Sequence, residues 1–379
     1  MQYMEIYQHN LTQQQDIDDI KIGFRPDVCF LFVSPDFQGY NKLHEKLTDK
    51  FPGAEFIGCS TAGEILDNQV HDTSIALTAV RFNRTRLKII TESLEAYEGD
   101  SFKIGQQVTD RLKRPDLKHI LLFSDGLNIN GGELVRGLRA QAPPLTTVTG
   151  ALAADGTRFN NTFVITKAGA QFKTLVALGL YSNHLNVGFG SHSGWDSFGI
   201  ERLVTRSETN KLYELDGKPA LALYKSFLGE QAKNLPGSAL LFPLSMRDEA
   251  GKRPVIRTIL GINEEEQSLT FAGNIPQRSY VRLMKANTDR LIQGAAKSAE
   301  VAKENGHSEP QLAFLFSCVG RKMVMDQLVE EEVEAVKEVF GNVAKTTGFY
   351  SYGEIAPFDK ESPCDLHNQT MSITTISED

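Results

Sequence analysis

Short runs of consecutive apolar residues alternate along the chain with segments whose apolar side chains recur every three or four positions. The run 28–33 is apolar throughout, which is typical of a strand that is buried on both faces. The segment 40–51 follows it with apolar residues at helical spacing, and Pro52-Gly53 ends that segment. The alternation predicts an α/β fold in which mixed sheets are layered with helices.

A second strand and helix repeat this order. An apolar strand over 120–123 precedes a helix predicted over 130–141. We expect Asn130 to cap that helix, with Glu133 supporting the cap. A further strand over 145–149 then leads into a glycine. The rest of the pattern predicts strands within 162–192 and over 238–245, 254–262 and 311–317, and helices at the end of 201–228, over 279–304 and over 325–340.

An internal repeat is the most informative motif in the chain. Residues 58–65 and 348–355 share the pattern Gly-x-x-x-x-Gly-Glu-Ile, and each is preceded by a strand containing Phe-Leu-Phe and then by a helix. A weaker third copy extends from Leu122 to Gly156. The sequence therefore predicts a strand–helix–strand–glycine-loop unit that is used repeatedly.

The repeats also suggest how the chain is divided. We expect a polar N-terminal arm or short helix over 1–27, a first domain over 28–215 and a second domain over 216–379. Two loops from two domains would then face each other across a cleft, where pockets often form.

The glycine loops are the predicted ligand site, because glycine lets the backbone approach a ligand closely. Glu64 and Glu354 occupy matching positions, where each either lines a shared site or hydrogen-bonds to its neighbouring loop. The residues expected to line the pocket are Gly58, Cys59, Ser60, Thr61, Glu64, Tyr352, Gly353 and Glu354.

Composition narrows the classes of protein. Hydrophobic residues make up 41% and charged residues 23% of the 379 residues, which excludes a wholly disordered chain. The net charge of −8 argues against nucleic acid as the main partner. No apolar run reaches the roughly 18 residues of a membrane span, and the start of the chain lacks a secretory signal. We expect a cytoplasmic protein without membrane insertion.

The sequence contains none of the common catalytic motifs. It has no phosphate-binding Gly-x-x-x-x-Gly-Lys-Ser/Thr, no His-Glu-x-x-His and no Gly-x-Ser-x-Gly. We therefore expect a protein that is not an enzyme. A thiol enzyme that uses Cys59 is the remaining catalytic alternative, although the sequence shows no base beside it. Cys364 and His367 supply at most half of a metal site.

The ordered motifs resemble those of FIST-domain proteins over nearly the whole chain. The matching segments are 58–65, 123–126, 149–156, the junction 210–220, 348–355 and 366–370. The resemblance implies a FIST N-terminal domain followed by a FIST C-terminal domain. It further implies a sensory module that binds a small ligand in signal transduction.

The resemblance to some stand-alone bacterial members of that family implies a more specific function. They are haem-binding nitric-oxide sensors that act on a partner histidine kinase. The resemblance therefore implies haem b as cofactor and nitric oxide as signal. It implies a two-component histidine kinase or another signalling protein as partner. A homo-oligomer is also possible from the sequence. His367 is the expected iron ligand and His192 the second candidate, although a residue separates His192 from Gly194 where many members have His-Gly-Trp.

Two alternatives stay open at this point. The imidazole of His367 is either an iron ligand or a group hydrogen-bonded within the fold. The ligand is either haem or, in a haem-free receptor, a small polar molecule such as an amino acid. In the second case Glu64 and Glu354 would bind an ammonium group and the loop amides a carboxylate.

Overall fold

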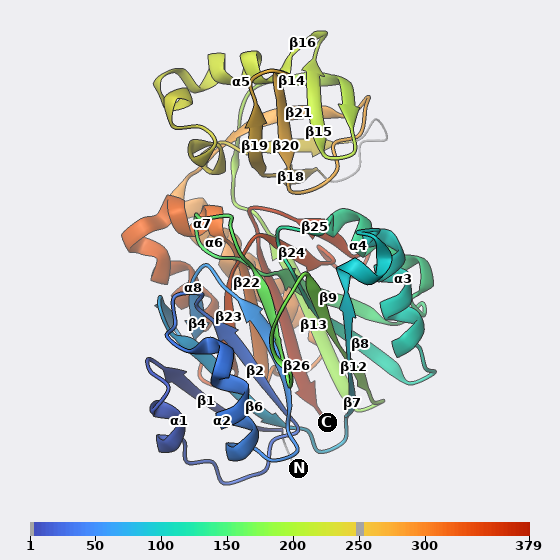
Figure 1. Ribbon diagram of the computed structural model, residues 1–379, viewed down its shortest axis with the longest axis vertical. Coiled ribbons are helices and arrows are strands. Elements are labelled where there is room, and N and C mark those ends of the chain that lie inside the picture. The colour runs from blue at the N-terminus through green and yellow to red at the C-terminus, as the bar shows by residue number, and fades with distance from the viewer. Residues whose placement is uncertain (1–3, 248–253) are drawn as a thin grey trace.

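The computed structural model describes residues 4–247 and 254–379. It consists of a body of three six-stranded mixed sheets and a smaller lobe above it (Figure 1). Helices cover the outer faces of the three sheets, so the predicted α/β class of mixed sheets layered with helices is confirmed.

The three sheets have the same strand order. Each contains one parallel pair joined by a helical crossover, with antiparallel strands on either side. The first sheet is β1 (Glu5–Leu11), β6 (Ile75–Arg81), β2 (Val28–Val33), β3 (Glu55–Ser60), β10 (Phe163–Thr166) and β11 (Gly169–Phe172). The second is β7 (Arg86–Ser93), β12 (Thr174–Tyr181), β8 (Leu117–Ser124), β9 (Thr147–Leu152), β24 (Gly353–Ala356) and β25 (Asp365–His367). The third is β13 (Leu185–His192), β26 (Met371–Glu378), β22 (Leu312–Cys318), β23 (Lys345–Ser351), β4 (Glu64–Leu66) and β5 (Gln69–His71).

The predicted repeat is thus a structural unit that occurs three times, and the units are interlocked. The hairpin that follows each parallel pair does not return to its own sheet. β4 and β5 pair onto β23, β10 and β11 pair onto β3, and β24 and β25 pair onto β9. Each unit therefore completes the sheet of another unit.

Helices cover each sheet on the side away from the other sheets. The helices of the body are α1 (Asp16–Asp19), α2 (Leu43–Lys50), α3 (Ser101–Leu112), α4 (Gly131–Gln141), α6 (Thr288–Gly306), α7 (Val319–Met325) and α8 (Val329–Phe340). The Asn130 side chain accepts a hydrogen bond of 3.1 Å from the Glu133 N–H, as predicted for the cap of α4.

The strands of the parallel pairs are buried on both faces. In β2, Phe30 and Phe32 face the other two sheets, whereas Cys29 and Leu31 face the α1–α2 layer. Phe123 of β8 and Phe316 of β22 join Phe32 in a central aromatic cluster, with ring centroids 5.5–6.4 Å apart. One residue of each unit thus forms the centre of the molecule.

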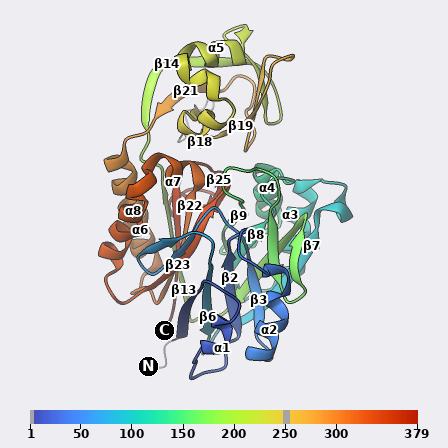
Figure 2. The ribbon, with the colours of Figure 1, turned by 60° about the vertical axis from the view of Figure 1, so that its left-hand side comes forward.

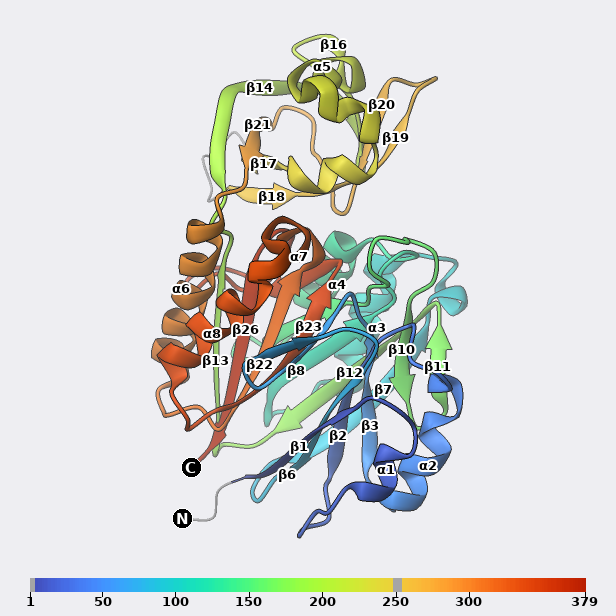
Figure 3. The same cartoon turned by 90° about the vertical axis from the view of Figure 1, so that its left-hand side faces the viewer.

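The lobe is inserted between β13 and α6 of the third unit. Figure 3 shows β14 leading from the body into the lobe and α6 leading back. Its elements are β14 (Asp196–Glu208), β15 (Lys211–Leu215), β16 (Lys218–Pro219), α5 (Ala220–Leu228), β17 (Leu244–Arg247), β18 (Val255–Arg257), β19 (Ile259–Asn263), β20 (Ser268–Phe271) and β21 (Tyr280–Lys285). The lobe lies over the end of the body formed by α4, α7 and β25 (Figure 2).

Two predicted elements are wrong. The helix expected from residue 279 begins only at Thr288. Residues 280–283 alternate between half-buried and buried positions, and 280–285 forms β21. The strand expected over 238–245 is a 3-10 helix, Gly237–Leu241, followed by β17; Pro243 lacks the N–H that a continuous strand requires.

The expected domains over 28–215 and 216–379 divide the sequence, whereas in space the chain is arranged as three units and a lobe. Segment 1–27, expected as an arm or short helix, contains β1 and α1 of the first unit. The boundary expected at residue 215 lies inside the lobe, at the end of β15. Because the units exchange hairpins, a boundary in the sequence does not separate two bodies in space.

Candidate functional site

The three repeat glycines hold equivalent positions in the three sheets. Each lies opposite a leucine of the neighbouring parallel strand, and a Cβ atom added there would overlap that leucine's carbonyl oxygen. The pairs are Gly58 with Leu31, Gly150 with Leu122, and Gly348 with Leu315. Glycine is required here for close packing of two strands.

Glu64 is fully buried and is hydrogen-bonded by its own unit. The Thr61 hydroxyl donates to one carboxylate oxygen. The Ser74 N–H and hydroxyl donate to the other at 3.1 and 2.8 Å. Burial is the largest influence on this carboxyl and raises the pKa of Glu64 to about 7.

Glu354 repeats this arrangement in the third unit. The Ser351 hydroxyl donates to it at 2.6 Å, and the Thr370 N–H and hydroxyl donate at 3.2 and 2.9 Å. Burial raises the pKa of Glu354 to about 8. Both glutamates therefore connect a strand end to the start of the unit's last strand, and each is enclosed within its own loop.

The remaining residues of the first loop are also packed inside the body. Cys59 is in the central core, and burial raises the pKa of its thiol well above the usual value. The Ser60 hydroxyl accepts a hydrogen bond of 3.1 Å from the Phe163 N–H. Thr61 differs from these residues, because it reaches the wall of a cleft.

That cleft has a volume of about 470 Å³ and lies at the carboxyl ends of the parallel strands, where open α/β sheets bind ligands. The loops after β2, β3 and β9, the β5–β6 turn and α7 form its walls. Its charged residues are Asp36, Asp72, Asp155, Arg158, Lys322 and Asp326.

Most of these charges are paired with one another. Arg158 donates to both oxygens of Asp36 at 2.8 Å, and the Lys322 ammonium contacts Asp72 and the Ala62 carbonyl oxygen. The Asp326 carboxylate forms no hydrogen bond or ion pair with another residue that the structure describes. With four carboxylates and two cations, the cleft has an acidic balance.

Tyr352 separates this cleft from a second pocket. Its hydroxyl donates to Asp155 in the cleft wall and lies 2.9 Å from the Gly156 carbonyl oxygen. Its ring, stacked on Phe159, lines a pocket of about 310 Å³ between the body and the lobe. The predicted loop residues thus meet two pockets only through Thr61 and Tyr352, whereas Gly353 is buried within β24.

The two predicted haem ligands, His367 and His192, both have a ring nitrogen beside a backbone carbonyl oxygen. His367 is buried, its Nε2 lies 2.7 Å from the Ala356 carbonyl oxygen, and its ring packs on Phe358 with centroids 4.1 Å apart. His192 ends β13, and its Nδ1 lies 2.8 Å from the Ser191 carbonyl oxygen. Neither imidazole lines one of the two pockets at the strand ends. Within 4–247 and 254–379, no three His, Cys, Asp or Glu side chains cluster as metal ligands.

The segment 366–370 fastens the body to the lobe. Arg257 of β18 donates to the Leu366 carbonyl oxygen at 2.9 Å. The Gln369 amide donates to the Leu240 carbonyl oxygen at 3.1 Å and to the Thr258 hydroxyl at 3.2 Å. The segment that the sequence suggested as a ligand motif thus makes several of the contacts between the body and the lobe.

Two family models together match most of the chain. The FIST N domain matches residues 27–218, and the FIST C domain matches residues 220–357. The chain belongs to the FIST family. FIST domains are sensory domains that bind small ligands in signalling. A curated relative of this FIST protein is an uncharacterized protein of Methanocaldococcus jannaschii, 24% identical, covering 92% of this chain and 75% of the relative.

Two solved structures are distantly similar to this FIST chain. A chorismatase structure is 11% identical and a cyanuric acid hydrolase structure 9% identical, each with a TM-score of 0.34 and complete coverage of both chains. No helix among the described residues has the length and apolar character needed to cross a bilayer.

The sequence predicted Thr61 as a lining residue of the cleft, but it did not identify the charged residues of the cleft as a site. Asp36, Arg158 and Asp326 lie outside the repeated motif and far apart in sequence. At Asp36 the available signal was its position just after the predicted strand 28–33, whereas Asp326 falls inside the helix predicted over 325–340. Only the topology of the sheets shows that the ends of these strands and helices lie side by side.

Proposed function

We propose that this FIST-family protein is a receptor for a small polar ligand that carries an ammonium group, such as an amino acid. The acidic cleft with the open carboxylate of Asp326 is the observation that carries the proposal. A cleft of about 470 Å³ is within the range of small-molecule sites. The ligand ammonium would bind Asp326, and a ligand carboxylate would bind Arg158 or Lys322.

The proposed role is binding without catalysis. Cys59, the thiol considered as a nucleophile, is fully buried and its raised pKa keeps it protonated. Glu64 and Glu354 are occupied by hydroxyl and amide donors within their own loops, which leaves the cleft aspartates to recognise the ligand.

The signal would pass to a partner protein, with a histidine kinase as the candidate from the family resemblance. Helix α7 contributes Lys322 to the cleft and packs against the 3-10 segment of the lobe. Arg321 holds α7 in place through a buried ion pair with Glu332 at 2.6 Å. Ligand contact with α7 would therefore change the seating of the lobe.

Haem binding with nitric-oxide sensing remains an untested prediction from the family resemblance. The enclosed ring of His367 gives it no support. Titration of the protein with haem, followed by absorbance, decides this point: a sharp Soret band at one haem per chain that is lost in His367→Ala would favour the haem sensor.

Calorimetric titration of the purified chain with each amino acid tests the receptor proposal. We expect saturable binding of at least one amino acid, weakened about 10- to 100-fold in Asp326→Asn, because a hydrogen bond to a charged group contributes about 1.5–3 kcal/mol. Asp110→Asn removes another exposed carboxylate, from α3, and should leave binding unchanged. Binding that Asp326→Asn leaves intact, or binding of no amino acid, would contradict the proposal.

A further inference from the structure

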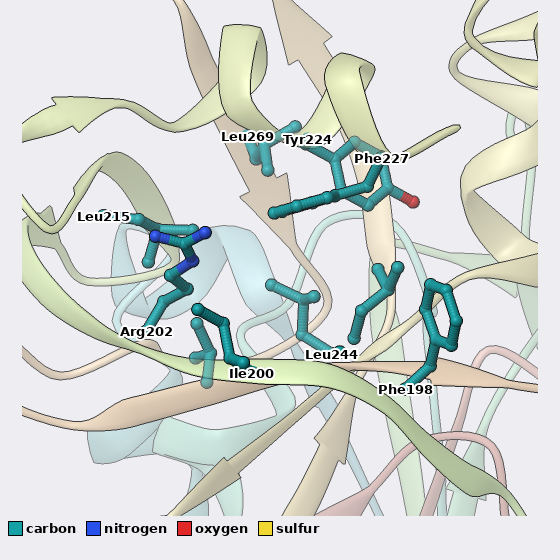
Figure 4. A pocket seen from close by; sticks show the side chains of 11 residues that line it. Phe198, Ile200, Arg202, Leu215, Tyr224, Phe227, Leu244 and Leu269 are labelled. Atoms are coloured by element: carbon teal, nitrogen blue, oxygen red, sulfur yellow. The ribbon is translucent and has the colours of Figure 1, made fainter. Parts of the chain in front are cut away.

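The lobe contains a small apolar cavity whose mouth is surrounded by exposed apolar side chains (Figure 4). Phe198 and Ile200 of β14 are 50% and 67% exposed, and Phe227 of α5 is 42% exposed. Apolar side chains of this size are normally covered when they cluster. Here three of them meet at one opening.

An irregularity in the backbone of β14 places these side chains at the mouth of the cavity. Pairing with β21 is interrupted between Phe198 and Arg202, and Gly199 adopts a φ of +73° in the interruption. Side chains 198, 200 and 202 all line the cavity, with Tyr224 and Phe227 of α5 opposite (Figure 4). The floor is formed by Leu215, Leu244, Leu269, Val281 and Leu283.

The size of the cavity limits its occupant. It measures about 40 Å³, far below the roughly 300 Å³ of the smallest usual small-molecule sites. Only the end of one side chain fits inside. Whatever carries that side chain must lie across the exposed rings outside, as a partner's apolar anchor does at a protein–protein interface.

The charged residues at the mouth of the cavity indicate which residues of the partner should flank its apolar side chain. Arg202 lies at the cavity wall with its guanidinium 5.8 Å from the Phe227 ring centre, and its buried Nε has no hydrogen-bond partner among the described residues. Among the described residues, the arginines at this mouth are Arg202, Arg247 and Arg282. The carboxylates beside them, Glu201 and Asp216, are each already paired with an arginine. An acidic partner complements this balance.

We propose that this surface, defined by Phe198, Ile200, Arg202 and Phe227, is the docking site for an acidic segment of a partner protein. The segment inserts one aliphatic side chain into the cavity and places a neighbouring carboxylate on Arg202. The inference rests on the proposed signalling through a partner, but not on which ligand occupies the cleft.

Panning of randomised, displayed short peptides against the full chain provides the test. We expect enriched sequences that contain an aliphatic residue beside Asp or Glu. One enriched peptide, synthesised and labelled, should bind at least about tenfold more weakly to Ile200→Ser and to Arg202→Lys, which keeps the charge but loses Nε. Leu145→Ser, at another 87% exposed apolar residue, should bind like the parent chain.

Other results would overturn the inference. These are the absence of enriched peptides, enrichment of peptides without the aliphatic–acidic pair, and equal peptide affinity for Ile200→Ser. Self-association in sedimentation that Ile200→Ser abolishes would assign the surface to a second copy of the chain. Asp326→Asn should keep peptide binding, so failure of the cleft proposal and failure of the docking proposal are distinguishable.

Discussion

At Gly58 the close approach of β2 and β3 leaves no space for a side chain. We expect Gly58→Ala to destabilise the protein by about 1–3 kcal/mol, because its Cβ would overlap the Leu31 carbonyl oxygen and one strand must shift. Denaturant unfolding measures the change. Gly261→Ala in β19 is the matched control, since the nearest atom to its Cβ is 3.9 Å away; an equal loss in both variants would contradict the argument.

The buried carboxyl of Glu354 should make stability depend on pH. Burial raises its pKa from an ordinary value of 4.5 to about 8, so the folded state keeps a proton that the unfolded state loses. Stability should therefore fall as pH rises through this window, by up to about 1.4 kcal/mol per pH unit for this proton.

Replacing that carboxyl by the amide that resembles its protonated form isolates this contribution. Glu354→Gln should show a shallower loss of stability than the parent chain between about pH 5 and pH 8 in urea unfolding. Glu361→Gln, at an exposed site, should follow the parent chain. Identical slopes for the parent chain and Glu354→Gln would show that Glu354 is ionised in the folded protein.

Among the elements, β18 and β25 connect the lobe to the body through one buried guanidinium. We expect Arg257→Met to remove the donor to the Leu366 carbonyl oxygen and to speed hydrogen exchange in peptides that span 238–258 and 366–370. Arg206→Met removes an exposed arginine of the lobe and should leave those peptides unchanged. Unaltered exchange in Arg257→Met would mean that other contacts seat the lobe.

The sequence could predict elements whose signals are local. The run 28–33 identified a doubly buried strand, and the Asn130 cap identified the start of α4. The alternation over 280–285 and the cap at Asn287 were also present and mark where β21 gives way to α6. Hairpin exchange between units has no local signal, because β4 pairs with a strand almost 300 residues away.

The same limit applies to the candidate site. The repeat marked Glu64 and Glu354 by their matching positions, and the structure explains the match by matching hydroxyl partners. A carboxylate that holds a loop and one that binds a ligand look alike in a sequence. Asp36 and Asp326 carry no repeat, and only the meeting of strand ends brings them into one cleft.

For the whole molecule, interlocking predicts that the three units unfold together. Phe32 contacts Phe123 of the second unit at 5.5 Å and Phe316 of the third at 6.4 Å between ring centres. We expect Phe32→Ala to cost about 3–5 kcal/mol, as other large core truncations do. Because each sheet contains strands from two units, the loss should appear in all three sheets.

Hydrogen exchange measured by mass spectrometry under native conditions can follow β2, β8 and β22 separately. Faster exchange by a similar factor in all three strands is expected for Phe32→Ala, since global unfolding exposes them at once. Phe172→Ala, at a half-exposed ring on the edge strand β11, should change exchange little. Faster exchange confined to the first sheet would mean that the exchanged hairpins do not couple the units, and that each unit opens by itself.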